Sequence, residues 1–183
     1  DRRWCESVRV VGTLLTAHFC AHLLPPPQQR HRQVRTATAW GPKAQAHLAR
    51  LKVGVVGLGS VGSLVAESLA RTGVQRIELI DYDTLKEHNL DRTLNATMNA
   101  VKQKRSKVAV SARALKRSAT ASAFAVEATE WSVCEEKGYR RALDCDVLFS
   151  CVDRPWARSV LNYIAYAHFI PVIDGGILAS RTK

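Results

Sequence analysis

The chain has 183 residues, enough for one ordinary domain with a sizeable core and too few for two large ones. It is 46% hydrophobic and 23% charged, which is near the globular average and excludes wholesale disorder. The formal net charge of +11 is unusual for a chain of this size.

Residues 1–31 are expected to form an N-terminal extension with a proline-rich linker, because the prolines of PPPQQRHRQ (25–33) cannot continue a helix. The apolar stretch 8–24 is too short and too polar for a membrane span, so no membrane partner is expected. A signal peptide is the less favoured alternative, since a small-residue cleavage site is lacking.

The cysteines form no C-x-x-C pair and are odd in number, which favours free thiols in a reducing, cytoplasmic compartment and leaves a zinc site unsupported. They are Cys5, Cys20, Cys134, Cys145 and Cys151.

Helices and strands alternate along the rest of the chain, which predicts an α/β, Rossmann-like fold with a mainly parallel sheet and helices on both faces. The expected strands are Val53–Val56, Arg76–Ile80, Ala123–Val126, Asp146–Cys151 and Ile170–Ile173. The expected helices are 43–50, Ser60–Thr72, about 106–117, about 134–143 and Trp156–Ala167. A polar stretch covers 81–103.

The G-x-G-x-x-G spacing of VGVVGLGSVG (53–62) follows a strand and opens a helix. Gly57 permits a tight turn, Gly59 lets a phosphate approach the backbone, and Gly62 lets helix and strand pack closely. The free N–H groups and the helix dipole favour an anion there. A glycine turn needed only for packing is the alternative.

Polar residues follow in DYDTLKEHNLDRT (81–93). Asp81 ends a strand where a carboxylate normally holds a ribose, which fits NAD and ATP equally well. Asn89 and Arg92 come next, and Lys107 begins a helix. Cations beside a glycine-rich turn suit a triphosphate whose leaving group must be neutralised.

Asp153 follows the apolar strand DVLFSC, at the carboxyl end where parallel sheets bind ligands. Its carboxylate is suited to hold Mg²⁺ against phosphates. Capping of the next helix is the competing interpretation.

No acid occurs between Arg92 and Val126, a segment that attracts the phosphates of a nucleotide or nucleic acid, or an acidic protein. A solvated helix face is the plainer alternative. Its basic residues are Arg92, Lys102, Lys104, Arg105, Lys107, Arg113, Lys116 and Arg117.

In their order, these motifs resemble the ThiF and MoeB family, the bacterial relatives of the adenylation domain of ubiquitin-activating enzymes. The resemblance covers about 32–183, including IPVIDGGI (170–177), and implies an ATP-binding adenylation domain that is incomplete at its C-terminus. The implied nucleotide-binding residues are Gly57, Gly59, Gly62, Asp81 (on the ribose), Asp83, Asn89, Arg92 and Lys107, with Mg²⁺ on Asp153.

The family also has an arginine that reaches the ATP of a neighbouring subunit, which implies a homodimer. Arg32 matches it best, and Arg35 is the second choice. Two departures stand out. Thr93 replaces a common glutamine, and the long basic interval after Arg92 makes Lys104 a rival to Lys107.

The resemblance implies adenylation of the C-terminal carboxylate of a ubiquitin-like or sulfur-carrier protein ending in Gly-Gly, with release of pyrophosphate. Arg92, Lys107 and Asp153, with Arg32, would carry the catalysis. The alternatives are an NAD(P)-dependent oxidoreductase and a non-catalytic partner subunit. Nucleic-acid binding is a third idea that rests on the basic segment alone.

Overall fold

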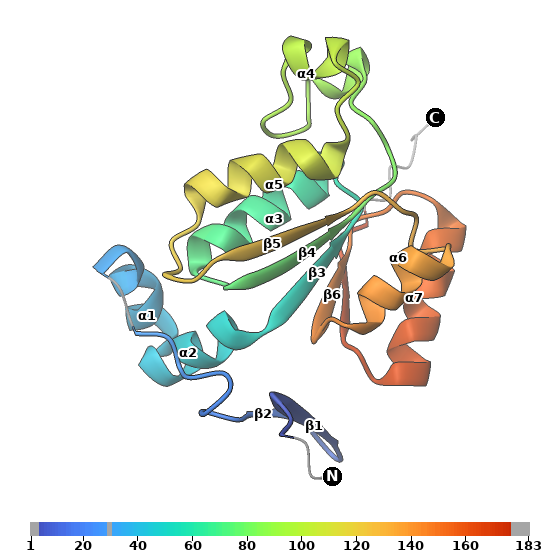
Figure 1. Cartoon of the computed structure of the whole chain (residues 1–183). Helices are drawn as coiled ribbons and strands as arrows, with labels where there is room; N and C mark the ends of the chain where they lie inside the picture. The colour runs from blue at the N-terminus through green and yellow to red at the C-terminus, as the bar shows by residue number, and fades with distance from the viewer. Residues whose placement is uncertain (1–3, 29–30, 177–183) are drawn as a thin grey trace, which may run out of the picture.

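The computed structural model describes residues 4–28 and 31–176. Their centre is a sheet of five strands, all paired in parallel and covered by helices on both faces (Figure 1). The predicted α/β, Rossmann-like fold is confirmed. The strands, in their order across the sheet, are β5 (Ala125–Thr129), β4 (Arg76–Ile80), β3 (Lys52–Val56), β6 (Val147–Ser150) and β7 (Val172–Asp174).

Two pairs of helices form the outer layers. On one face lie α3 (Ser60–Thr72) and α5 (Lys107–Ser118), and on the other lie α6 (Glu136–Leu143) and α7 (Pro155–His168). The smaller elements are η1 (His31–Gln33), α1 (Val34–Trp40), α2 (Pro42–Arg50), η2 (Glu87–Asn89) and α4 (Met98–Lys102), which stands out from the body beyond α5 (Figure 1).

The central strands contribute side chains to two separate apolar clusters, because alternate side chains of a strand point to opposite faces of the sheet. Val53 and Val55 of β3 pack under α3 and α5, whereas Val56 packs under α6 and α7. Both faces of β3 are therefore buried, which explains the unbroken apolar run in its sequence.

The direction of the connections reverses between β3 and β6. From β3 the chain proceeds to β4 and β5 on one side, while β6 and β7 extend the sheet on the other. In open parallel sheets the ligand crevice lies at such a switch point, outside the carboxyl ends of the strands. The glycine turn follows β3 and Asp153 follows β6, so the two meet at this point.

Some predicted features differ from the structure; strand β7, for one, begins at Val172 and not at Ile170. The polar stretch 81–103 contains α4, which has only five residues and is too short to show helical periodicity; its N-cap is the Thr97 hydroxyl, which accepts from the N–H of Ala100 at 3.2 Å. Strand β5 starts two residues later than predicted. It is an edge strand with three exposed side chains, so its apolar pattern is weak.

The N-terminal extension contains an antiparallel hairpin of β1 (Ser7–Val11) and β2 (Leu15–Phe19). Glu6 pairs with Arg76 at 2.9 Å, and the Arg50 guanidinium lies 4.7 Å from the centre of the Phe19 ring. Among the residues that the structure describes, no helix is long and apolar enough to cross a membrane.

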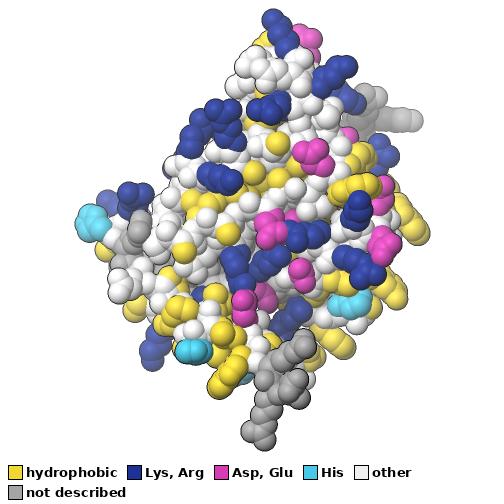
Figure 2. Space-filling view, viewed as in Figure 1, with side chains coloured by type: hydrophobic (Ala, Val, Ile, Leu, Met, Phe, Trp, Pro, Cys, Tyr) yellow, Lys and Arg dark blue, Asp and Glu magenta, His cyan; other side chains and the backbone are white. Residues whose placement is uncertain are grey.

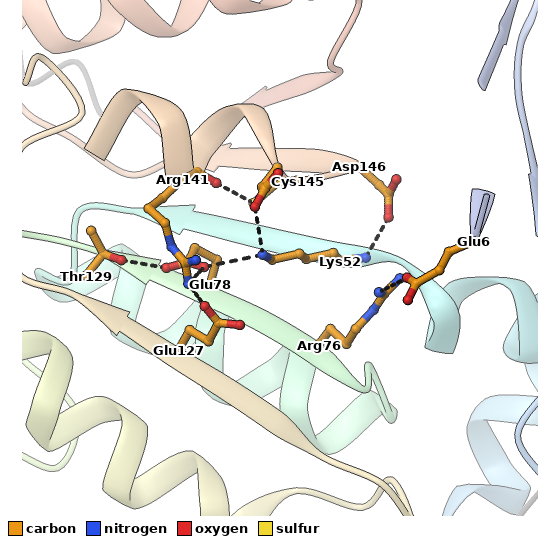
Figure 3. Close-up of polar contacts among 10 residues, drawn as sticks. Glu6, Lys52, Arg76, Glu78, Glu127, Thr129, Arg141, Cys145 and Asp146 are labelled. Carbon is orange, nitrogen blue, oxygen red and sulfur yellow. Dashed lines mark hydrogen bonds and ion pairs between the residues drawn. The ribbon is translucent and has the colours of Figure 1, made fainter. Parts of the chain in front are cut away.

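A buried ionic cluster joins α6 to the sheet (Figure 3). Its centre is Glu78 of β4, which is fully buried and pairs with Arg141 at 2.7 Å and with Lys52 at 3.6 Å. The Thr129 hydroxyl donates to the same carboxylate at 2.7 Å, and Arg141 also pairs with Glu127. Helix α6 is thus held by charges as well as by apolar packing.

Replacing Glu78 with Ala should lower the free energy of unfolding by about 3–5 kcal/mol, because two cations lose their buried partner. Denaturant unfolding measures this. Glu136→Ala is the control: its pair with Arg140 is exposed, so its loss should cost about 0.5 kcal/mol or less. Equal losses in both variants would contradict a special role for the buried cluster.

Candidate functional site

A cleft of about 760 Å³ opens at the carboxyl edge of the sheet. This volume lies in the usual range for small-molecule sites. The walls come from four segments: the glycine turn, the loop after β4, residues 131–135 after β5, and residues 151–158 after β6. Gly175 and Gly176, directly after β7, complete them.

The glycine turn is closed on its inner side and open toward the cleft. Gly57 has φ +87°, and a side chain there would lie 2.7 Å from the carbonyl oxygen of Cys151. A side chain at Gly62 would collide with the carbonyl oxygen of Gly57. At Gly59 no atom lies within 4 Å of the position of a side chain, so an anion can approach the start of α3 from this direction.

Asp81 fastens this turn to the end of β4. One carboxylate oxygen accepts from the Leu58 N–H at 2.6 Å, and the other accepts from the Asp83 N–H at 2.8 Å. Each oxygen keeps a further lone pair, so hydroxyl donors in the cleft can still bind. Burial raises the pKa of Asp81, and the two backbone hydrogen bonds oppose that effect.

Asp83 and Lys107 link the loop after β4 to the start of α5. The Lys107 ammonium lies 2.8 Å from the Asp83 carboxylate, and the Lys107 N–H donates to the Asp83 carbonyl at 2.9 Å. Both residues line the cleft. Lys104 is exposed and does not line it, so of the two rival lysines only Lys107 lies where the nucleotide is expected.

Asn89 shapes the turn that presents Arg92. The Asn89 side-chain oxygen accepts from the Lys86 N–H at 3.0 Å, and its carbonyl accepts from the N–H groups of Arg92 and Thr93. Asn89 is buried, whereas the Arg92 side chain is 47% exposed and pairs with Asp91 at 2.8 Å. Arg92 thus lines the cleft as a partly exposed cation whose backbone is held by Asn89.

Asp153 lies on the opposite wall and is exposed. The interpretation of Asp153 as a helix cap is wrong: the N-cap of α7 is Arg154, and no side chain makes a cap hydrogen bond there. The Asp153 carboxylate therefore has no structural task at the helix terminus.

The structure does not bring Arg32 or Arg35 to this cleft. Both are exposed, in η1 and α1. The neighbouring Gln33 hydrogen-bonds Thr120 at 3.2 Å and lies against Gly73, which caps the far end of α3. A role for Arg32 at the site of a neighbouring subunit stays a proposal.

Arg158 was missed in the sequence. Its guanidinium donates twice to the Val152 carbonyl, at 3.0 and 3.1 Å, and pairs with Asp174 at 3.2 Å. It also fills the space where a side chain at Gly176 would stand. Arg158 thereby fixes the turn that carries Asp153 against the end of β7.

Sequence reasoning also missed the wall formed by 131–135. The Trp131 ring lies here with the Lys137 ammonium 4.2 Å from its centre. Cys134 and Cys151 line the same cleft. Burial raises the pKa of Cys151 to about 11, so at neutral pH this thiol is not a thiolate nucleophile.

In the described part of the chain, no three His, Cys, Asp or Glu side chains lie close enough together to form a metal site made of protein ligands alone. Magnesium rarely needs such a site, because it binds through one or two carboxylates and the phosphates of its substrate. An exposed Asp153 that lines the same cleft as the glycine turn fits that mode of binding.

The fold and the cleft define the class: a Rossmann-like α/β protein with an open glycine turn at the switch point of its sheet. More particularly, the chain belongs to the ThiF family, whose profile matches residues 31–183.

Individual relatives differ in what they do. The tRNA threonylcarbamoyladenosine dehydratase of Bacillus subtilis is 41% identical over 73 residues, which are 40% of this chain and 29% of that protein. The sulfur carrier protein ThiS adenylyltransferase of Bacillus subtilis is 27% identical over 140 residues, 76% of this chain and 41% of that protein.

A solved structure of tRNA N6-threonylcarbamoyladenosine dehydratase from Escherichia coli, in complex with ATP, superposes with a TM-score of 0.71 and 27% identity. The match covers 79% of this chain and 58% of that one. The chain thus spans less than two thirds of the length of each of these relatives.

The raised pKa of Asp81 predicts how this residue affects stability. Its contribution is fully present below the ordinary pKa of about 3.9, where folded and unfolded forms are both protonated, and is lost as pH rises through the folded pKa. Asp81→Asn cannot titrate, so the unfolding free energy of the parent minus that of the variant should fall with rising pH and then level off. Denaturant unfolding at a series of pH values measures it, and a difference that grows with pH would contradict the assignment.

Proposed function

We propose that the chain is the ATP-binding part of an enzyme that adenylates a carboxylate and releases pyrophosphate. One observation carries the proposal: Asp81, Arg92, Lys107 and Asp153 converge on one cleft around an open glycine turn. Membership of the ThiF family supports it, as do an ATP-bound relative and a relative named as an adenylyltransferase. The acyl substrate we propose is the C-terminal carboxylate of a ubiquitin-like or sulfur-carrier protein ending in Gly-Gly.

ATP would bind with its ribose hydroxyls donating to the free lone pairs of Asp81. Its phosphates would lie at the start of α3, where Gly59 leaves room for them. Asn89, Arg92 and Lys107 stand on the side of the cleft that faces this turn and would hold the phosphate oxygens. Lys107 would exchange its ion pair with Asp83 for one with phosphate.

In the reaction a carboxylate oxygen of the substrate attacks the α-phosphorus, and the bond from that phosphorus to the oxygen bridging to the β-phosphate breaks. The electron pair leaves with pyrophosphate, and an acyl-adenylate remains. Arg92 and Lys107 would neutralise the charge that gathers on the departing phosphates, which is most of the work in phosphoryl transfer. Mg²⁺ held by Asp153 would add Lewis-acid stabilisation of the same charge.

We further propose that the active form is a homodimer in which Arg32 reaches the cleft of the neighbouring subunit. This accounts for an exposed arginine that is remote from the cleft of its own chain. The two rival functions fit the cleft less well. Binding of a redox dinucleotide would not require Arg92, Lys107 and Asp153 together. A non-catalytic subunit would not need to keep all three side chains in its cleft.

A second candidate is adenylation of a carboxylate carried by an RNA. The specific observation in its favour is the segment 92–126, which has basic residues and, after Asp91, no acid until Glu127. A relative with 41% identity over its matched region is named as a tRNA-modifying dehydratase, and the chemistry of carboxylate activation would be the same.

Arg92→Ala should slow ATP–pyrophosphate exchange about a hundredfold while changing the Kd for ATP by about threefold or less. The reason is that its charge matters most as the phosphates separate. Arg140→Ala is the matched control, since Arg140 is an exposed arginine of α6 paired with Glu136. Exchange within a few-fold of the parent in the Arg92 variant would remove this residue from the mechanism.

Asp153→Asn should lower exchange at least about tenfold and raise the Mg²⁺ concentration needed for half-maximal rate, with only partial rescue at high Mg²⁺. Its unfolding free energy should be unchanged, because Asp153 makes no cap hydrogen bond. Asp144→Asn, at an exposed carboxylate outside the cleft, is the control. A normal rate with unaltered Mg²⁺ dependence would show that Asp153 binds no metal.

A further inference from the structure

A group of cations lies outside the cleft, on the end of α4, on the connection to α5 and on α5 itself. We call it the basic ridge. All six side chains are exposed, and none makes an ion pair with any residue in the described ranges. The ridge consists of Lys102, Lys104, Arg105, Arg113, Lys116 and Arg117.

The carboxylates near the ridge are already engaged elsewhere. Glu67 of α3 pairs with Arg71 at 2.7 Å and accepts from Ser118, while Glu130 accepts from the Ser106 hydroxyl at 2.6 Å. Glu127 pairs with Arg141, on the other face of the sheet. Figure 2 shows the result: Lys and Arg side chains gather over α4 and α5 with few acidic side chains among them. Among the described residues, no ion pair therefore compensates the positive charge of the ridge.

The ridge is also poor in apolar surface. In the segment 92–126 the one exposed large hydrophobic side chain among the described residues is Met98. The outer face of α7 is the opposite case, because Trp156, Tyr163 and Tyr166 are all strongly exposed there. Protein interfaces are enriched in aromatic residues and depleted in lysine at their cores, whereas nucleic-acid interfaces are polar and strongly positive. The ridge, which is polar and strongly positive, resembles a nucleic-acid interface.

The ridge leads to the candidate site. Helix α5 begins at Lys107, which lines the cleft. Its twelve residues span roughly 18 Å, so the cations near its C-terminal end lie about that far along the helix from the cleft. Arg113, Lys116 and Arg117 are three and four positions apart, so they share one face of the helix. A polyanion lying along this face would have one end beside the cleft.

We propose that the basic ridge is a docking surface for the phosphodiester backbone of an RNA. The proposal rests on the second candidate function, which makes an RNA the carrier of the carboxylate. Binding along the ridge needs neither ATP nor the chemistry of the cleft, so it can be measured separately.

The test uses a bulk tRNA mixture as the probe, without ATP, and follows binding by the full chain between 50 and 200 mM salt. Lys116→Glu/Arg117→Glu should weaken binding at least about tenfold and lower the slope of log affinity against log salt by about 2, since each lost phosphate contact removes about one unit. Lys43→Glu/Arg140→Glu is the matched control: it makes the same change in net charge on α2 and α6, away from the ridge.

Equal losses in the two double variants would overturn the proposal, because binding would then follow net charge and not the ridge. Polyglutamate bound as tightly as tRNA at equal charge would also overturn it, in favour of an acidic protein. The thermal unfolding temperatures of both double variants must match that of the parent, so that weaker tRNA binding can be attributed to the changed surface and not to unfolding. If ATP binding fails in every form, including the parent, adenylation is refuted while the tRNA measurements still decide the ridge.

Discussion

The carboxylate of Asp81 is the point on which the site depends. It accepts one hydrogen bond from the glycine turn and one from the loop after β4, so two segments from different strands are fixed to a single side chain. Asp83, which is set by that loop, pairs with Lys107 and so positions the start of α5. The arrangement explains why a carboxylate is kept here although burial raises its pKa and so works against its charge.

The features that sequence predicted well are those set by local chemistry. Helix Ser60–Thr72 was predicted to the residue, because a glycine turn opens it and Gly73 ends it with φ +96°. Strands β3 and β4 were clear since both of their faces are buried and most of their residues are apolar, with Glu78 of β4 as the buried exception. The glycine turn, Asp81 and Lys107 are likewise readable because their spacing from the strands and helices is fixed.

The features that escaped prediction depend on contacts between distant segments. Arg158 becomes informative only when its two partners are seen together: Val152 lies just after β6, and Asp174 ends the neighbouring strand β7. Trp131 follows an exposed edge strand that has little pattern of its own. Nor did spacing alone separate Lys104 from Lys107, because both are basic residues near one helix terminus; their different distances from the cleft depend on the fold of the loop before α5.

The ion pair between Asp83 and Lys107 has a consequence for turnover. The lysine already has a counter-ion 2.8 Å away, so the triphosphate of the proposed reaction would have to compete with a carboxylate for it. A ligand with several phosphate charges wins that competition more easily than one with a single phosphate. In the proposed reaction, Asp83 would be close enough to pair with the ammonium again as pyrophosphate departs, and the same exchange of partners would then weaken the hold on the product.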